Sequence, residues 1–402
     1  MNVLCLCVDR LHRNFVGAYG NTWIHTPALD RFAFESAVFD QFLVETPEPA
    51  AVLQAAWTGL HPLQSRSSDA SLILALNDAG FDTLLVTDSW DLLPVELASQ
   101  FRRRILTDVP LPERPVDEIG QTYLAGVFAQ CVAVLETATE PFCAWVVLRG
   151  LGGPWDAPID LRAHYADEGD PPPYEAILPP NLPFRKEDDP DILLAILQAY
   201  AAQATVLDSC LEAFREWFIN WPGRDRTAIL FLSLRGFPLG EHGWIGADAP
   251  QIFSEVIHTP LIVRLPERVP AALRIPALVE PADLCPTVAE LAELAGQPSF
   301  GIGRSLLPLI TEQTAELRNR IVLTETNGVR ALRTGYWFFR DTDPPELYIK
   351  PDDFWDFSNV ADRCADVAEA MRKTIAADIE ALREGRWEDF AVLDECVTTR
   401  PE

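Results

Sequence analysis

Positive charge is scarce in this sequence of 402 residues. Lysine and arginine together number 32 against 60 aspartates and glutamates, which gives a net charge of −28. A surface this negative repels the phosphates of nucleic acids and the headgroups of anionic lipids, so we expect neither nucleic acid nor a membrane as a partner. It also repels sulfate and phosphate esters unless a local positive site overrides the global field. Since Lys186, Lys350 and Lys373 are the only lysines, such a site would be built from arginine or from a metal ion.

Two further absences bear on redox chemistry and on location. The eight cysteines include no Cys-x-x-Cys pair, so their spacing predicts neither a zinc site nor a disulfide framework. Cys5 and Cys7 instead share one face of the first expected strand, where we expect them to be buried as small apolar side chains. No signal peptide precedes this strand, and no apolar run approaches the length that spans a bilayer. We therefore expect a cytoplasmic protein.

Apolar residues make up 48% of the chain, which is enough to bury a large core. Runs that are apolar throughout, rather than alternating, predict strands buried on both faces and hence a mainly parallel sheet. These runs are residues 3–8, 82–86, 142–148, 227–233 and 259–263. Between residues 191 and 217 the apolar spacing is helical, which predicts a helix packed on the sheet. The expected fold class is α/β, with a large, doubly wound, mainly parallel sheet flanked by helices.

The amino-acid composition and the spacing of apolar residues change at two places along the chain. Residues 167–190 are rich in Pro, Asp and Glu, which predicts a surface excursion without a strand or a helix interior. After about residue 310, short runs separated by turn residues predict a small antiparallel sheet. These runs are residues 321–325, 328–333 and 336–340. An Ala/Glu/Arg-rich terminal helix is expected at 362–385, so we expect a large domain at 1–310 and a small α+β domain at 311–402.

A series of short motifs runs along the whole chain. The first strand ends in Asp9, and Thr58-Gly59 is followed by Pro62. Further motifs lie at residues 17–21, 25–31, 239–243, 259–264, 283–287, 303–307, 333–337 and 345–348. In their order they resemble the landmarks of the sulfatase family, within the alkaline phosphatase superfamily. In that family the first strand ends in metal-binding aspartates, and a Thr-Gly-x-x-Pro follows the nucleophile. The resemblance implies an alkaline phosphatase-like fold with a small C-terminal domain.

The position of the nucleophile departs from the family pattern. Sulfatases oxidise the Cys or Ser of a Cys/Ser-x-Pro-x-Arg motif to formylglycine, whose hydrate attacks sulfur. Counting between the flanking Thr-Pro and Thr-Gly places Pro49 at the nucleophile, Ala51 at the motif proline and Leu53 at the arginine. Proline has no side-chain nucleophile, and the formylglycine motif occurs nowhere else in the chain. The resemblance therefore implies a degenerate member of the family.

The expected metal ligands are also mostly missing. The family holds a divalent cation with carboxylate and amide oxygens, two acids from the first strand and an acid with its neighbour after a later strand, because a hard cation needs several oxygen ligands at one point. Here Asp9 is kept but is followed by Arg10, and Leu234 and Arg235 stand at the later position. A lone aspartate between two guanidinium groups cannot compete for Ca²⁺ or Mg²⁺. We therefore expect no metal and no other cofactor.

Two further catalytic positions have changed. The family's Lys-x-His corresponds to Asp88-Ser89-Trp90, and its mid-chain histidine corresponds to Gly152. Loss of the nucleophile, the lysine, the histidines and most metal ligands together indicates loss of the chemistry. His242, in a Gly-Glu-His-Gly loop, is expected to have a structural role.

The arginines at the strand ends are the most informative candidates. Arg10 and Arg235 can form an internal salt-bridge cluster with Asp9 that plugs the former metal site, since an unpaired buried carboxylate is costly. Alternatively, they line a pocket that binds a sulfated, phosphorylated or carboxylated small ligand without turning it over, with His12 and His258 as further candidate anion-binding residues. A third alternative is an alignment that is shifted by a few residues.

The function favoured by these observations is a catalytically inactive, sulfatase-like protein with a binding, scaffolding or regulatory role. Its partner would be an anionic small ligand, a second copy of the chain or an active relative. The alternative is a working sulfuric or phosphoric ester hydrolase with a rebuilt site, and only then would Ca²⁺ or Mg²⁺ be expected.

Overall fold

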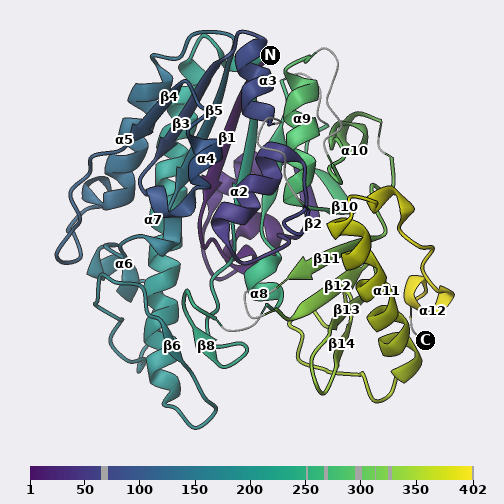
Figure 1. Cartoon of the computed structure of the whole chain (residues 1–402). Coiled ribbons are helices and arrows are strands. Elements are labelled where there is room, and N and C mark those ends of the chain that lie inside the picture. Colours follow the sequence, from purple (N-terminus) through teal and green to yellow (C-terminus); the bar gives the residue numbers. More distant parts are fainter. Residues whose placement is uncertain are drawn as a thin grey trace.

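The computed structural model describes residues 1–64, 71–249, 252–266, 270–294, 301–312, 314–324 and 328–400. Its centre is an eight-stranded sheet in the order β10-β2-β9-β7-β1-β5-β3-β4 (Figure 1). The strands are β1 (Asn2–Val8), β2 (Ala37–Phe42), β3 (Asp82–Thr87), β4 (Arg103–Leu106), β5 (Phe142–Leu148), β7 (Thr227–Ser233), β9 (Leu261–Arg264) and β10 (Leu273–Val279). β9 pairs antiparallel with β2 and β7, whereas the other neighbouring strands of this sheet are parallel. The expected mainly parallel, doubly wound sheet is confirmed.

Alternate residues of β1 show why the sheet is covered on both faces. Val3, Cys5 and Cys7 belong to the core beneath α2 (Pro49–Thr58), α3 (Leu72–Asp78) and α9 (Leu284–Leu291). Leu4, Leu6 and Val8 belong to the opposite core, beneath α1 (Pro27–Phe34), α5 (Tyr123–Leu135) and α7 (Pro190–Asn220). A continuous apolar run therefore serves two cores at once, and the expectation that both cysteines are buried is confirmed. Shorter helices complete the large domain: α4 (Val95–Ala98), α6 (Ile159–Ala163), α8 (Ser254–Ile257) and α10 (Leu307–Thr311).

The long helix α7 is the only helix in the described part of the chain with the length and composition of a membrane span. The sequence-based expectation that no apolar run approaches this length is therefore corrected. In the most apolar window, 61% of the helix is buried inside the protein. It begins at Pro190, whose preceding Asp189 side chain accepts a hydrogen bond from the Asp191 amide. Its apolar content is explained by packing on the sheet, as the helical spacing predicted.

The proline-rich excursion before α7 contains a short strand that the sequence did not indicate. β6 (Leu182–Pro183) pairs antiparallel with β8 (Trp244–Ile245). Proline is tolerated in β6 because this two-residue strand has a single partner and needs no second set of ladder bonds. The pairing ties the excursion to the loop that follows β7.

The second, smaller sheet has the antiparallel order β11-β12-β13-β14 (Figure 1). Its strands are β11 (Arg320–Thr324), β12 (Arg330–Thr334), β13 (Trp337–Arg340) and β14 (Glu346–Ile349). One face joins the core of the large domain through Ile321, Leu323 and Phe338, and the other packs on α11 (Ala365–Arg383). The expected small sheet and terminal helix are confirmed, although Glu325 of the first expected run lies outside the described residues. A last helix, α12 (Glu395–Thr398), follows α11.

Candidate functional site

The carboxyl ends of the central strands bring the sequence-predicted residues together. Asp9 and Arg10 directly follow β1, Leu234 and Arg235 directly follow β7, and Gly152 lies in the loop after β5. Since these three strands are parallel neighbours, the residues after them meet at one edge of the sheet, where α/β proteins commonly bind ligands. In Figure 1 this edge faces downward, away from the N-terminus.

The carboxylate of Asp9 is held by two guanidinium groups. Arg235 donates from Nε to Oδ1 at 3.0 Å and from Nη2 to Oδ2 at 3.1 Å. Arg10 Nε lies 3.2 Å from Oδ2. Asp9 is only 2% exposed, so these pairs replace the water that an isolated carboxylate would need. Arg235 Nη1 also donates to the carbonyl of Pro47 at 3.0 Å, which links this cluster to the loop before α2.

The loop after β5 is shaped around Arg10. Arg10 itself has φ +65°, in the left-handed region, and the Asp9 carbonyl accepts a hydrogen bond from the Leu151 amide at 3.1 Å. A Cβ atom on Gly152 would lie 2.6 Å from Arg10 Cδ and 2.8 Å from its Nε. The absence of a side chain at Gly152 therefore leaves the space in which the Arg10 side chain lies. Burial lowers the pKa of Arg10, while the charge of Asp9 opposes this shift.

The donor set of this cluster does not suit a divalent cation. Both oxygens of Asp9 are already bonded to guanidinium groups, and Leu234 is buried in the core with no oxygen to offer from its side chain. Ca²⁺ takes about six to eight oxygen ligands. Among the residues that the structure describes, no group of three or more His, Cys, Asp or Glu side chains is arranged to hold a metal ion. A resident Ca²⁺ or Mg²⁺ therefore does not fit these residues.

The expected nucleophile position lies at the start of α2. Pro49 is the first residue of this helix, and its ring carries no hydroxyl or thiol. Leu53, which the sequence comparison predicts at the position of the motif arginine, is fully buried in the core. Neither residue can form a covalent intermediate through its side chain or clamp a sulfate group.

Asp88 has a local role in the structure. It follows β3, is buried, and accepts a hydrogen bond from the Arg149 amide to Oδ1 at 2.8 Å. Arg149 in turn donates from Nη2 to the Asp88 carbonyl at 3.0 Å. Burial raises the pKa of Asp88, and the hydrogen bond from Arg149 opposes the shift. These contacts join the ends of β3 and β5, and no contact links Asp88 to Asp9 within the described chain.

His12 lies beside the cluster, in a network that the sequence did not indicate. The Tyr200 hydroxyl accepts from the His12 amide at 2.8 Å and donates to the Arg10 carbonyl at 2.7 Å. His12 Nδ1 accepts from the Asn14 amide, so Nε2 carries the proton and faces Glu241 Oε1 at 3.3 Å. Burial raises the pKa of Glu241, but the neighbouring His12 opposes this effect and the net shift is downward. Tyr200 lies among the buried residues of α7, and only the contacts of its hydroxyl identify it as a site residue.

His258 lies in a separate cluster, away from Asp9. Its Nε2 donates to the Asp40 carbonyl at 2.7 Å. Burial, together with the charge of Arg13, lowers the pKa of His258 well below its usual value. The side chain is therefore neutral and engaged with the backbone, and the structure does not bring it together with Arg10 and Arg235.

His242 connects the large domain to the small one. Its Nδ1 lies 2.7 Å from Glu255 Oε1, its Nε2 lies 3.1 Å from the Asp356 carbonyl, and its ring stacks on Phe253. The buried side chain of Asp356 also forms an ion pair with Lys350. These contacts hold the segment after β14 against the large domain near the candidate site.

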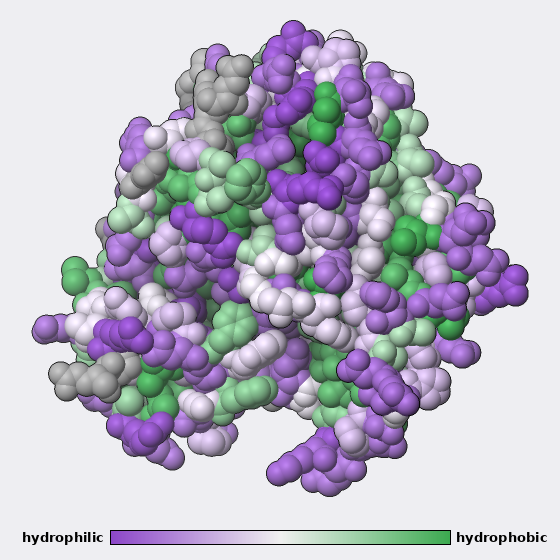
Figure 2. Space-filling model, turned by 180° about the vertical axis from the view of Figure 1, so that it is seen from behind, coloured by the Kyte–Doolittle hydropathy of each residue, from purple (hydrophilic) through white to green (hydrophobic). Residues whose placement is uncertain are grey.

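Aromatic side chains surround the outer edge of the site. Trp355 lies 6.3 Å from His12 between ring centroids, and Phe15 lies between His12 and Trp23. Trp23 and Trp355 are 42% and 38% exposed, respectively, so both also face solvent. From behind, the surface is hollowed at its lower edge between two lobes (Figure 2). One lobe contains β6 and β8, and the other is the small domain (Figure 1).

The central sheet and the small C-terminal domain match the hydrolase fold of the alkaline phosphatase superfamily. The family model described as Sulfatase matches residues 1–294, and the model described as N-sulphoglucosamine sulphohydrolase, C-terminal, matches residues 240–383. The chain therefore belongs to the sulfatase family, as the ordered motifs predicted.

Solved structures share this fold at low sequence identity. The phosphonate monoester hydrolase of Agrobacterium radiobacter has a TM-score of 0.75 at 19% identity, covering 100% of both chains. A 2-O glycosaminoglycan sulfatase has a TM-score of 0.74 at 16% identity, covering 100% of this chain and 96% of the other. The phosphonate monoester hydrolase of Silicibacter pomeroyi has a TM-score of 0.73 at 16% identity, covering 98% of each chain.

A curated relative matches over a shorter stretch. The N-acetylglucosamine-6-O-sulfatase of Bacteroides thetaiotaomicron is 35% identical over 117 residues, which is 29% of this chain and 20% of that protein. The match therefore spans about a fifth of the relative's length.

Proposed function

We propose that this sulfatase-family protein does not hydrolyse sulfate esters and instead binds a small anionic group at its strand-end site. The cluster of Asp9, Arg10 and Arg235 carries the proposal. In it, guanidinium groups bond the carboxylate that a metal ion would require, and Pro49 stands where the nucleophile is expected.

The charges around Asp9 favour a site that binds an anion over an internal salt-bridge cluster that fills the former metal site. Within hydrogen-bonding distance, two guanidinium groups face the one carboxylate of Asp9, while Asp248 acts on Arg10 only through longer-range charge and Glu241 faces His12. Arg10 uses Nε toward Asp9, and its terminal nitrogens have no hydrogen-bond acceptor among the described residues. A sulfate, phosphate or carboxylate group could accept from those nitrogens in the paired geometry that guanidinium favours.

Exposed aromatic rings beside the site support a ligand with a flat or apolar part. Trp23 and Trp355 offer such surfaces on either side of His12 through the contacts described above. The relatives named above are a sugar sulfatase, a glycosaminoglycan sulfatase and a phosphonate monoester hydrolase. The proposal takes from them the class of anion, a sulfate or phosphate-type group.

The first experiment measures turnover of aryl sulfate and aryl phosphate with Ca²⁺, Mg²⁺, Mn²⁺ or Zn²⁺ added in turn. The expected result is no turnover above a protein-free control. Turnover that disappears in Asp9→Ala would overturn the proposal and favour the alternative, an ester hydrolase with a rebuilt site.

The second experiment measures anion binding by the rise in melting temperature with sulfate, phosphate and sulfated or phosphorylated sugars. We expect at least one of these anions to stabilise the protein and Arg10→Gln to remove the effect. The matched control is Arg226→Gln, which removes the same charge from an exposed arginine that pairs with Glu140. No shift with any anion would instead support an internal plug without a ligand.

The cytoplasmic location and a partnership with a second copy or an active relative remain predictions of the sequence. Co-expression with an active family member, followed by size-exclusion chromatography, tests the latter. A complex that survives dilution would support a regulatory role.

A further inference from the structure

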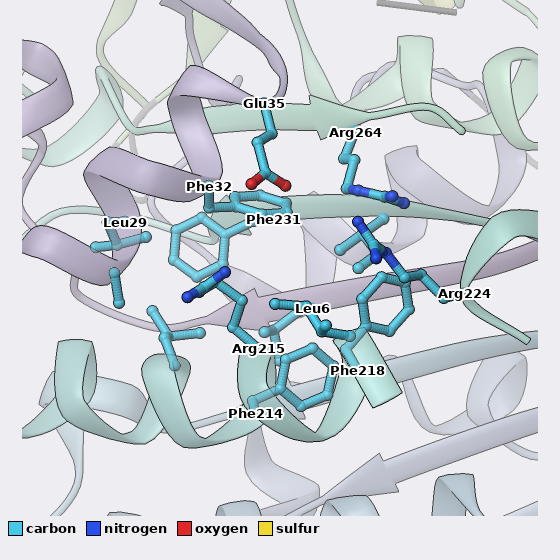
Figure 3. A pocket seen from close by; sticks show the side chains of 14 residues that line it. Leu6, Leu29, Phe32, Glu35, Phe214, Arg215, Phe218, Arg224, Phe231 and Arg264 are labelled. Atoms are coloured by element: carbon cyan, nitrogen blue, oxygen red, sulfur yellow. The ribbon is translucent and has the colours of Figure 1, made fainter. Parts of the chain in front are cut away.

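A second pocket lies at the opposite edge of the large sheet from the Asp9 cluster. It is enclosed by α1, by the C-terminal half of α7 and by the sheet face of β1 and β7 (Figure 3). Arg224 precedes β7, whereas Arg235 follows it. The seven-residue strand separates the two regions by about 20 Å at roughly 3.3 Å per residue. The pocket is therefore independent of the proposed function.

The walls of this pocket are apolar. They are formed by Leu6, Ala28, Leu29, Phe32, Leu211, Phe214, Phe218, Ile219, Ile229 and Phe231. The enclosed volume is about 40 Å³. Because about 10–15 Å³ of such space accommodates one water-sized group, the pocket holds about three groups of that size. A short hydrocarbon chain fits this space, and water finds few partners there.

Charged side chains lie at the mouth of the pocket. Figure 3 shows Arg224 and Arg264 next to each other on one side, with Arg215 and Glu35 elsewhere around the opening. Arg215 is paired with Glu212 through two hydrogen bonds of 3.1 Å. Arg264 lies over the Phe218 ring at 5.2 Å and donates weakly to the Thr227 carbonyl at 3.4 Å.

Arg224 and Arg264 are adjacent cations without a carboxylate between them. No acidic side chain in the described part of the chain forms an ion pair with either one. Glu35 and Asp225 act on Arg264 only through longer-range charge, and the nearby charge of Arg224 opposes them. In a protein with 60 acidic residues, two neighbouring unpaired guanidinium groups over an apolar pocket favour an anionic ligand.

We propose that this pocket binds a short, unbranched carboxylic acid. The carboxylate lies between Arg224 and Arg264, and the hydrocarbon tail enters toward Leu6 and Phe32. The guanidinium pair supplies the charge-assisted hydrogen bonds, and the apolar walls supply the gain from removing the tail from water. The pocket encloses about three carbon atoms of the tail, and the carbons next to the carboxylate lie at the open mouth beside the two arginines.

The test uses hexanoate as the probe, with calorimetric titration of the full-length protein as the readout. Acetate lacks the tail, hexanol lacks the charge, and hexylamine has the opposite charge. We expect hexanoate to bind at millimolar concentration or below, and each of the other three to bind about tenfold more weakly or worse.

Variants assign the binding to this pocket. Arg224→Gln and Arg264→Gln are each expected to weaken hexanoate binding about tenfold, and Ala28→Leu, which fills the cavity from α1, is expected to abolish it. Arg226→Gln is the matched control, because it removes the same charge from the same turn outside the pocket and should leave binding unchanged. Since Arg224 is half-buried in a short turn before β7, its variant keeps the test valid even where Arg264→Gln fails to fold.

Three outcomes would overturn the proposal. One is the absence of hexanoate binding at millimolar concentration. Another is hexanol binding as tightly as hexanoate. The third is an equal loss in Arg226→Gln, which would indicate nonspecific attraction to positive charge.

Discussion

Replacing Arg235 by methionine tests the central cluster most directly. The substitution keeps most of the length and packing of the side chain but leaves Asp9 with Arg10 as its remaining charged partner. Removal of one member of a buried ion pair costs about 3–5 kcal/mol, because the other charge stays buried. Asp9 is 2% exposed and the Arg235 side chain is 16% exposed. Since Arg10 still contacts Oδ2 at 3.2 Å, we expect a loss at or just below the lower end of this range, about 2–3 kcal/mol in the free energy of unfolding.

Urea unfolding followed by circular dichroism measures this loss, and a double-mutant cycle with Asp9→Asn separates its cause. If the cost arises from an unpaired carboxylate, the double variant should lose at least about 1 kcal/mol less than the sum of the two single variants. Arg226→Met is the control, because its exposed pair with Glu140 should contribute about 0–1 kcal/mol. A loss in Arg235→Met no larger than in Arg226→Met would refute the argument that this pair is buried and essential.

Three further outcomes are expected. Gly152→Ala should lower the free energy of unfolding by about 1–3 kcal/mol in urea titrations, because its Cβ would overlap Arg10. Gly120→Ala is the control and should not lower it, since a Cβ there meets nothing within 4 Å. Equal effects of the two substitutions would contradict the role given to Arg10. Burial raises the pKa of Glu45 to about 8, so the neutral carboxyl group favours folding, and this contribution to stability is lost as pH rises from about 5 to 8. Urea titrations across this range should show a smaller decline in the free energy of unfolding for Glu45→Gln than for the unchanged protein. Identical declines in the two proteins would contradict the role given to Glu45. Six of the eight cysteines are buried. Ellman's reagent should therefore modify at most Cys364 and Cys396 in the native protein, and all eight cysteines after denaturation. Rapid labelling of a third cysteine in the native protein would show that the core is more open than described.

Local sequence patterns were sufficient for much of the large sheet. The runs at 142–148 and 227–233 coincide with β5 and β7, because a strand that is buried on both faces must be apolar at each position. β4 escaped detection since its Arg-Arg-Ile-Leu sequence is half-exposed at the sheet edge. β9 was located approximately, but its antiparallel direction depends on how the chain returns to the sheet, which no local pattern records.

The candidate site likewise combines residues that the sequence indicated with residues that only the structure revealed. Asp9, Arg10 and Arg235 could be singled out because the resemblance to the sulfatase family places them at the strand ends where a metal ion would be held, and parallel strands end at a common edge. Tyr200 and Glu241 could not be singled out, since a tyrosine in an apolar helical stripe looks like any core residue until its hydroxyl is seen between two backbone groups. His258 precedes β9, whose antiparallel direction brings it to the same end of the sheet as the site, but its ring contacts the Asp40 carbonyl and not the cluster around Asp9.

The sequence by itself determined the family, the buried strands and the side-chain chemistry available at each position, such as the ring of Pro49 and the guanidinium groups of Arg10 and Arg235. These follow from covalent chemistry and from short-range periodicity, both of which are present in the unfolded chain. Only the tertiary structure decided that Arg235 reaches Asp9 and the Pro47 carbonyl at once, and that Arg224 and Arg264 meet over an apolar pocket. Such contacts join residues tens or hundreds of positions apart, and their distances are set by the packing of whole helices and strands.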